Sequence, residues 1–283
     1  FLSLPVALIF WALSAALLAL ALRRSRGELF ERQIPVMGVM AAFIFAAQMI
    51  NFPVAGGTSG HLLGGALTAI TLGPWAAMLV MTAVVGVQAL VFQDGGLAVM
   101  GANIFNMGLV TALIGYGLYR AVAGRSLRVR LVTAGAAAWL SVLAGALFTA
   151  LQLWLSGTVA LQVVVPAMVG VHAVIGLGEA FITVAALSFI ERTRPDLVQV
   201  SASPRGGWGW VAGGVALSLF VVVLSPLASA SPDGLMRVAQ DLGFAQAQLT
   251  PAYQALPGYS IPVLGEGPLS QLAAGGIGVA LLF

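Results

Sequence analysis

The side chain best suited to bind a metal ion in this sequence is His61, one of only two histidines among 283 residues. It lies in the stretch Gly56–Gly65, in which five of the ten residues are glycine. Glycine permits unusual backbone conformations and a close approach of another segment. Imidazole binds nickel, cobalt, copper and zinc ions. An imidazole on a glycine-rich turn between two apolar runs predicts a functional site, with helix capping or packing as the alternative.

Further polar residues lie in the apolar part of the chain. His172 and Glu179 are seven residues apart, so they share one face of a helix about two turns from each other. They could form an ion or proton path, or a buried polar network that fixes helix packing, which is the interpretation that we prefer. Asn103 and Asn106 share a face close after Asp94, and these side chains could line a pocket or join helices by hydrogen bonds.

A hydrolytic function has to be weighed as well. Gly57-Thr58-Ser59-Gly60 is similar to the GxSG sequence of intramembrane serine proteases, and a histidine follows on a later span. A serine nucleophile needs a base within hydrogen-bond reach. The glycine pattern around His172 matches that family poorly, and a protease leaves the adjacent His61 unexplained. We therefore interpret Ser59 as a pocket residue, and labelling of Ser59 by a fluorophosphonate would favour the protease instead.

Composition identifies the class of protein. Hydrophobic residues make up 60% of the chain and charged residues 7%, as in polytopic membrane proteins. Eleven of the twelve arginines fall in three short clusters between apolar runs, which is typical of topology signals and not of a nucleic-acid-binding surface. The chain contains no lysine, which excludes a GxxxxGK[ST] phosphate-binding loop, and no cysteine, which excludes disulfides and thiolate metal sites.

The apolar runs predict an all-α bundle with about seven spans in residues 1–192, namely Leu4–Leu22, Ile34–Ile50, His61–Leu72, Pro74–Phe92, Leu97–Tyr119, Leu131–Leu155 and Val163–Ile190. His61–Leu72 would reach only about 18 Å as a helix. It must count as a crossing, because the first and second arginine clusters should both face the cytoplasm. Asn51–Gly60 is then a loop that dips into the protein, and His61 and the N-terminus lie on the outer side.

The rest of the chain forms a separate module. Residues 193–209 are expected to form a cytoplasmic linker, and residues 210–283 a module with one or two further spans. In this module Trp210–Pro226 is a span, Leu227–Ser270 is an outer loop, and Gln271–Phe283 is an apolar run too short to cross a bilayer.

Several motifs together resemble the CbiM/NikM family, the substrate-binding membrane components of cobalt and nickel energy-coupling factor transporters. They are Phe1-Leu2-Ser3, Pro53–Gly65, Leu72-Gly73-Pro74, Phe92–Leu97, Gly101–Gly108 and His172–Glu179. The stretch Ser231-Pro232-Asp233-Gly234-Leu235 resembles the PDGLE-type, NikN-like module that is often fused to such proteins, although Met236 replaces the glutamate of that motif.

The resemblance implies a transporter component and not an enzyme. Ni²⁺ or Co²⁺ is the transported substrate, held in a square plane by His61 and by nitrogens of residues that would precede Phe1. No organic cofactor and no nucleic acid are expected. The protein would be a multi-pass component of a prokaryotic plasma membrane, embedded in its lipid bilayer.

The same resemblance implies protein partners. A membrane coupling subunit would dock on small residues of the first span, which Ala12, Ala15, Ala16 and Ala19 could supply, and two cytoplasmic ATPases would drive inward release. The alternative is a secondary carrier that works alone, with His172 and Glu179 as its ion path. Uptake that survives mutation of a partner ATPase would favour that carrier.

Overall fold

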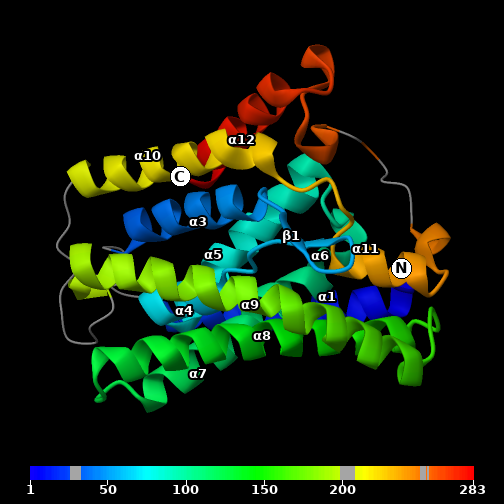
Figure 1. Cartoon of the computed structure of the whole chain (residues 1–283), viewed down its shortest axis with the longest axis horizontal. Helices are drawn as coiled ribbons and strands as arrows, with labels where there is room; N and C mark the ends of the chain where they lie inside the picture. The colour runs from blue at the N-terminus through cyan, green and yellow to red at the C-terminus, as the bar shows by residue number, and fades with distance from the viewer. Residues whose placement is uncertain (26–32, 198–207, 249–252, 254) are drawn as a thin grey trace.

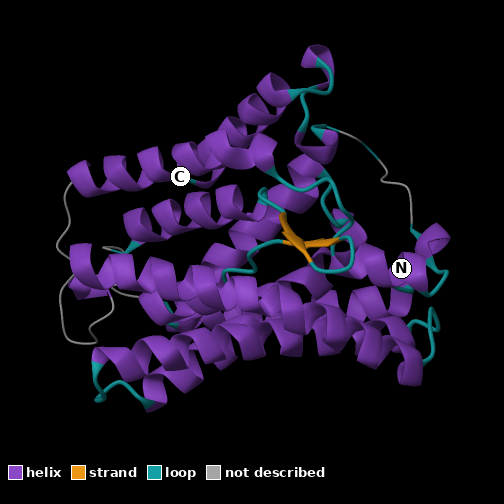
Figure 2. Ribbon diagram, in the orientation of Figure 1, coloured by secondary structure: helices purple, strands orange, loops and turns teal. Residues whose placement is uncertain are grey.

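A computed structural model describes residues 1–25, 33–197, 208–248, 253 and 255–283, and within them the chain forms a bundle of helices (Figure 1). The helices are α1 (Leu4–Arg24), α3 (Ile34–Gln48), α4 (Gly65–Leu72), α5 (Pro74–Val87), α6 (Gly96–Asn103), α7 (Thr111–Ala121), α8 (Leu127–Leu155), α9 (Leu161–Thr193), α10 (Trp208–Leu224), α11 (Gly234–Asp241) and α12 (Pro268–Leu282). Strands β1 (Phe52–Val54) and β2 (Thr58–Gly60) form one small hairpin near the middle of the bundle (Figure 2). The predicted all-α class is confirmed.

Irregular turns connect several of these helices. Two are π-helical, Gln88–Phe92 at the end of α5 and Ile104–Val110 between α6 and α7. The others are short 3₁₀ turns at Pro195–Leu197, Ser225–Leu227, Ala245–Ala247, Pro257–Tyr259 and Pro262–Leu264.

In the described part of the chain, six helices are long and apolar enough to cross a membrane: Leu4–Arg24, Pro74–Phe92, Gly96–Ala121, Leu127–Leu155, Leu161–Thr193 and Trp208–Leu227. Ile34–Gln48 and Pro268–Leu282 are shorter apolar helices of 15 residues each. These lengths confirm a multi-pass membrane protein. The last helix begins at Pro268, three residues before the predicted apolar run, because proline is favoured in the first turn of a helix.

The predicted helix His61–Leu72 is wrong at its start. The helix begins at Gly65, has eight residues, and is buried along nearly its whole length. Gly64 directly before it has a left-handed backbone (φ +80°), which a continuing helix excludes. A helix this short rises only about 12 Å, so α4 lies inside the bundle and does not itself span the membrane.

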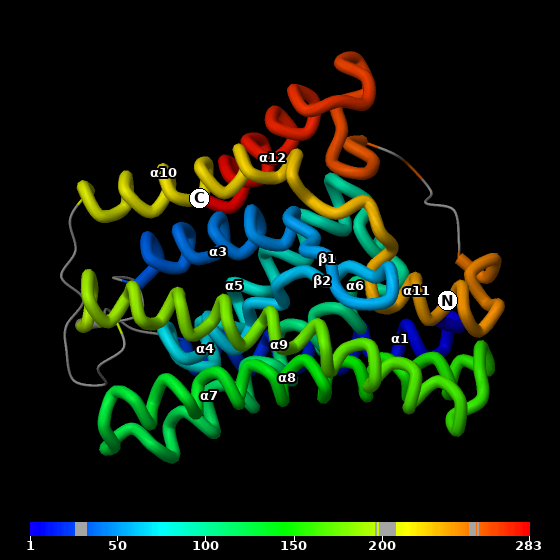
Figure 3. The backbone as a smooth tube through the Cα atoms, in the orientation of Figure 1, coloured from blue at the N-terminus to red at the C-terminus, as the bar shows by residue number. Residues whose placement is uncertain are grey.

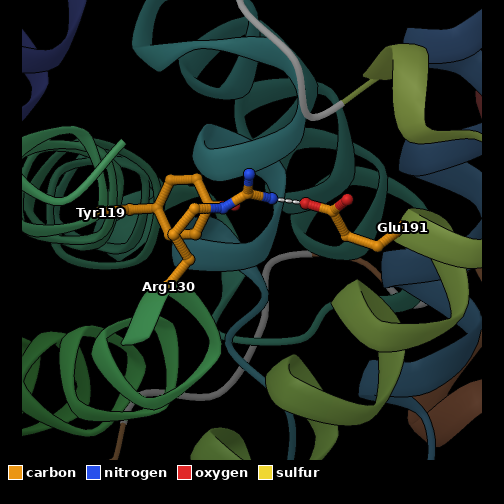
Figure 4. Close-up of polar contacts among 3 residues, drawn as sticks. All are labelled: Tyr119, Arg130 and Glu191. Carbon is orange, nitrogen blue, oxygen red and sulfur yellow. Dashed lines mark hydrogen bonds and ion pairs between the residues drawn. The ribbon is translucent and has the colours of Figure 1, made fainter. Parts of the chain in front are cut away.

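Helices α8 and α9 form a long antiparallel pair along one face of the bundle (Figure 3). An ion pair between Arg130 of α8 and Glu191 of α9 joins the two helices, and Arg130 Nε also donates to the hydroxyl of Tyr119 on α7 at 3.1 Å (Figure 4). Three helices are therefore tied together where their side chains are nearly shielded from solvent.

The bundle has two distinct ends. The turn between α7 and α8, the last turn of α9 and the start of α10 lie at one end, whereas α11 and Phe1 lie toward the other (Figure 1). Arg120 and Arg130 flank the first of these turns, and Arg192 lies in the last turn of α9. Two arginine clusters therefore share one end. Arg26, Arg32, Arg205 and residues 198–207 of the predicted linker lie outside the described residues.

Candidate functional site

The segment before His61 is a β-hairpin and not the loop that the sequence predicts. Phe52 pairs with Gly60 and Val54 with Thr58, in antiparallel register. Gly56 and Gly57 make the turn, both with positive φ. Ser59 and Gly60 are buried, so His61 directly follows a strand that lies inside the protein.

A distant part of the chain pairs with this hairpin. The backbone N–H of Ser59 donates to the carbonyl of Pro232 at 2.8 Å, and its hydroxyl donates to the carbonyl of Ser231 at 2.8 Å. Ser59 and Asp233 form a parallel bridge. The Ser231–Asp233 segment thus pairs with β2 through one isolated bridge and two hydrogen bonds. Because the Ser59 hydroxyl is buried and bonded to a carbonyl, with no base among its described partners, the site does not support the protease.

His61 is partly buried, and its ring is oriented by the backbone beside it. Nδ1 lies 3.0 Å from the carbonyl oxygen of Leu62. With the proton on Nδ1, this contact is a hydrogen bond, and the lone pair of Nε2 is then available to a metal ion. No residue in the described part of the chain forms a hydrogen bond with Nε2. The arrangement therefore presents one imidazole nitrogen as a ligand.

The two residues before α4 are held from both sides. The backbone N–H groups of Leu63 and Gly64 donate to the two carboxylate oxygens of Glu179, at 2.6 and 2.9 Å. From α3, Gln48 Nε2 donates to the Leu63 carbonyl at 2.8 Å, and Gln48 Oε1 accepts from Gln88 Nε2 at 2.8 Å. Gln48 and Gln88 were not predicted as site residues, although an amide within an apolar span is a pattern that could have identified them.

The hairpin and the Asp233–Gly234 segment both pack against α9 between His172 and Glu179. A side chain at Gly178 would collide with the ring of Phe52, and one at Gly234 would lie 2.8 Å from His172 Cε1. His172 Nδ1 lies 2.7 Å from the Met168 carbonyl. His61 is within electrostatic range of His172 and Glu179. Ser59, His61, His172 and Glu179 therefore lie in one region of the described structure.

The other predicted pocket residues have partners elsewhere. Asp94 accepts a hydrogen bond from Tyr259 at 2.7 Å. Asn106 exchanges two hydrogen bonds of 2.9 Å with Gln152 on α8, and Asn103 lies against Gly95. A π-helical turn begins directly after Asn103, and the two asparagines have no hydrogen-bond partner in common among the described residues.

The four predicted docking residues of α1, Ala12, Ala15, Ala16 and Ala19, are all exposed. Within the described residues, no three His, Cys, Asp or Glu side chains converge as a metal site.

Comparisons with known proteins agree with this architecture. A family model described as the cobalt uptake substrate-specific transmembrane region, CbiM, matches residues 1–197. A relative in Archaeoglobus fulgidus, named "Putative fused nickel transport protein NikMN", is 36% identical over the whole of this chain and 93% of its own length. The cobalt transport protein CbiM of Sorangium cellulosum is 34% identical over 67% of this chain and 88% of its own.

A solved structure described as a transition metal transporter has a TM-score of 0.61 and 31% identity, covering 72% of this chain and 97% of its own. The names of these relatives describe transport proteins, which confirms the prediction of a transporter component and not an enzyme. The fused relative matches the C-terminal segment as well, which confirms the predicted NikN-like fusion. The chain belongs to the CbiM family of cobalt uptake substrate-specific transmembrane proteins.

Proposed function

We propose that this protein is the substrate-binding membrane component of an uptake system for Ni²⁺ or Co²⁺. The observation that carries the proposal is the imidazole of His61, whose Nδ1 is engaged by the Leu62 carbonyl and whose Nε2 is open to a metal ion. Nitrogen ligands suit both ions. The relatives are named for nickel transport and for cobalt transport, so the ion is cargo and not a resident cofactor.

His61 supplies one nitrogen of the proposed square-planar set, and the family resemblance implies that the others come from an N-terminal segment. Phe1 lies against the C-terminal segment, with its ring 5.4 Å from that of Phe244, and its carbonyl accepts from Thr158 at 2.6 Å. Phe1 packs in one apolar cluster with Val238 and Ala239 of α11, and Gly234 in the first turn of α11 lies against His172. This placement supports an ion site on the side of α11.

The proposed transport cycle depends on other polypeptides. A membrane coupling subunit docks on the exposed face of α1 formed by Ala12, Ala15, Ala16 and Ala19, where small side chains permit close helix approach. Two cytoplasmic ATPases drive inward release. The end with Arg120 and Arg192 faces the cytoplasm, and His61 takes its ion from the outside. In this proposal, residues 1–192 are the membrane domain, residues 193–209 are the cytoplasmic linker, and residues 210–283 are a NikN-like module of one span, an outer loop and a last apolar run.

Metal binding by the purified full-length protein tests the proposal. Titration with Ni²⁺ and with Co²⁺ is expected to give one site per chain, abolished by His61→Ala. His172→Gln is the matched comparison, because it removes the other imidazole. Binding that survives His61→Ala, or that is abolished only by His172→Gln, would contradict the assignment.

Uptake in cells tests the partners. We expect inactivation of the partner ATPases to stop accumulation of Ni²⁺ or Co²⁺. The solitary carrier is less favoured, because His172 and Glu179 are engaged by backbone groups and do not form a continuous path. Uptake that persists without the ATPases would support that carrier instead.

A further inference from the structure

We infer that Glu179 is a positioning residue for the His61 imidazole and acts through the peptide group that joins Leu62 to Leu63. Gln48 supports it from the opposite side. The inference rests on the proposed function, since it explains how the one ligand in the described chain is aimed.

The contacts form a continuous relay. Glu179 Oε2 accepts from the N–H of Leu63 at 2.6 Å. That N–H belongs to the same planar peptide as the carbonyl of Leu62, and in a trans peptide the two groups point in opposite directions. The Leu62 carbonyl oxygen in turn lies 3.0 Å from His61 Nδ1. Fixing the N–H therefore fixes the carbonyl, and the carbonyl fixes the ring.

The next peptide is fixed as well. Its N–H, on Gly64, donates to Glu179 Oε1 at 2.9 Å, and its carbonyl, on Leu63, accepts from Gln48 Nε2 at 2.8 Å. Two successive peptide planes are thus held between α9 and α3. The following carbonyl, on Gly64, already begins α4 by accepting from the backbone N–H of Thr68 at 2.9 Å. The segment after His61 has little freedom to rotate.

The carboxylate has a further effect on the ring. Both oxygens of Glu179 accept from backbone N–H groups, which is the pattern of an ionised carboxylate. Hydrogen bonds to such a group are stronger than those between neutral groups, and linked hydrogen bonds polarise one another in a shielded interior. Glu179 is fully buried. Its pull on the Leu62–Leu63 peptide strengthens the carbonyl as an acceptor for Nδ1–H, and this favours the tautomer with a free Nε2. Many metal-binding histidines have such a carboxylate or carbonyl behind them, and here a peptide links the two.

A purely structural role for Glu179 makes a different prediction. In that case its loss lowers the stability of the protein and leaves the affinity and the electronic spectrum of the bound ion unchanged. The visible absorption of bound Ni²⁺ depends on ligand geometry, so it separates positioning from folding.

The experiment compares five forms of the full-length protein: wild type, His61→Ala, Glu179→Gln, Gln48→Met and Thr183→Val. Dissociation constants and visible spectra are measured with Ni²⁺ alone, at a temperature where each form is folded. Thr183 is the matched control, because it lies on α9 one turn beyond Glu179, is fully buried, and has no hydrogen-bond partner for its hydroxyl among the described residues.

We expect Glu179→Gln to weaken Ni²⁺ binding by on the order of tenfold to a hundredfold, the effect usual for residues behind a metal ligand, and to shift the visible bands. Gln48→Met should act in the same direction and less strongly, and Thr183→Val should match wild type. Affinity and spectrum like those of wild type in Glu179→Gln would overturn the inference. If Glu179→Gln does not fold, the same result in Gln48→Met overturns it.

Failure of the proposed function is distinguishable from failure of the relay. If His61→Ala binds Ni²⁺ as wild type does, the ligand assignment itself is wrong. If His61→Ala abolishes binding and Glu179→Gln does not weaken it, the function stands and the positioning role falls.

Discussion

Gly234 packs directly against the His172 ring, and the structure leaves no room for a side chain at this position. A methyl group there would lie 2.8 Å from His172 Cε1 and from Ile175 Cδ1. We expect Gly234→Ala to lower the free energy of unfolding by about 1–3 kcal/mol, because the added atom forces the segment off α9. Gly213→Ala is the control, since no described atom outside its own stretch of α10 lies within 4 Å of the added methyl. Thermal unfolding of the solubilised protein measures both, and equal effects would refute the packing argument.

Tyr259 gives a second prediction at this scale. Burial of its hydroxyl and the neighbouring Asp94 carboxylate raise the pKa of Tyr259 well above its ordinary value. A group with a raised pKa in the folded state stabilises the protein below its unfolded pKa, about 10, and loses that contribution as the pH rises further. The stability difference between wild type and Tyr259→Phe should stay constant from about pH 7 to 9 and change above about pH 10. A difference that remains constant at higher pH would contradict the linkage.

The spacing of His172 and Glu179 places them correctly on one face of α9, but it could not show what they bind. Their partners are backbone groups of residues 63, 64 and 168, two of them more than 100 residues away in sequence. A backbone N–H is present at nearly every residue, so no sequence pattern marks the one that will be used.

At the scale of elements, the long helices could be predicted to within a few residues, because apolar runs of sufficient length specify them. The hairpin and the late start of α4 could not. The hairpin strands have three residues each, and their pairing is completed by Pro232. The start of α4 depends on Gly64 and Glu179, which come together only in the folded chain.

Helix α11 depends on Asp233, the residue directly before it. Asp233 Oδ1 accepts from the N–H of Met236 at 2.7 Å and caps the helix. Asp233→Ala should cost about 1 kcal/mol and loosen α11, since the cap satisfies an N–H that has no partner within the helix. Hydrogen exchange across Gly234–Asp241 measures the loosening. Asp241→Ala, at the other end, removes only an exposed pair with Arg237 and should change exchange little. Comparable exchange in both variants would argue against the cap.

At the scale of the whole molecule, the ion pair of Arg130 and Glu191 holds α8 to α9 at the end with the arginine clusters. The exposed fractions of the two side chains are 16% and 10%, so either charge left alone would be poorly hydrated. Arg130→Gln should destabilise the protein by about 3 kcal/mol, as measured for broken buried pairs. Arg237→Gln, which breaks the exposed pair, should cost less than about 1 kcal/mol. Thermal unfolding compares the two, and a similar loss in both would be unexpected.

The class of the molecule followed from its composition, and two of the three arginine clusters have described residues at one end of the bundle. The contact of the last third of the chain with the hairpin was not predicted. This contact depends on the backbone N–H of Ser59 and on Gly234, and neither residue belongs to a periodic pattern in the sequence.

The pairing of the Ser231–Asp233 segment with the hairpin has a consequence for how the protein is made. Because the segment belongs to the same polypeptide as the hairpin that it covers, its effective concentration there is set by the tether between them and not by the amount of protein in the cell. Tethers of this kind commonly give effective concentrations in the millimolar range. Each hairpin is therefore made together with one Ser231–Asp233 segment to pair with it. A cell that made the two parts separately would need a tighter contact to keep the same occupancy.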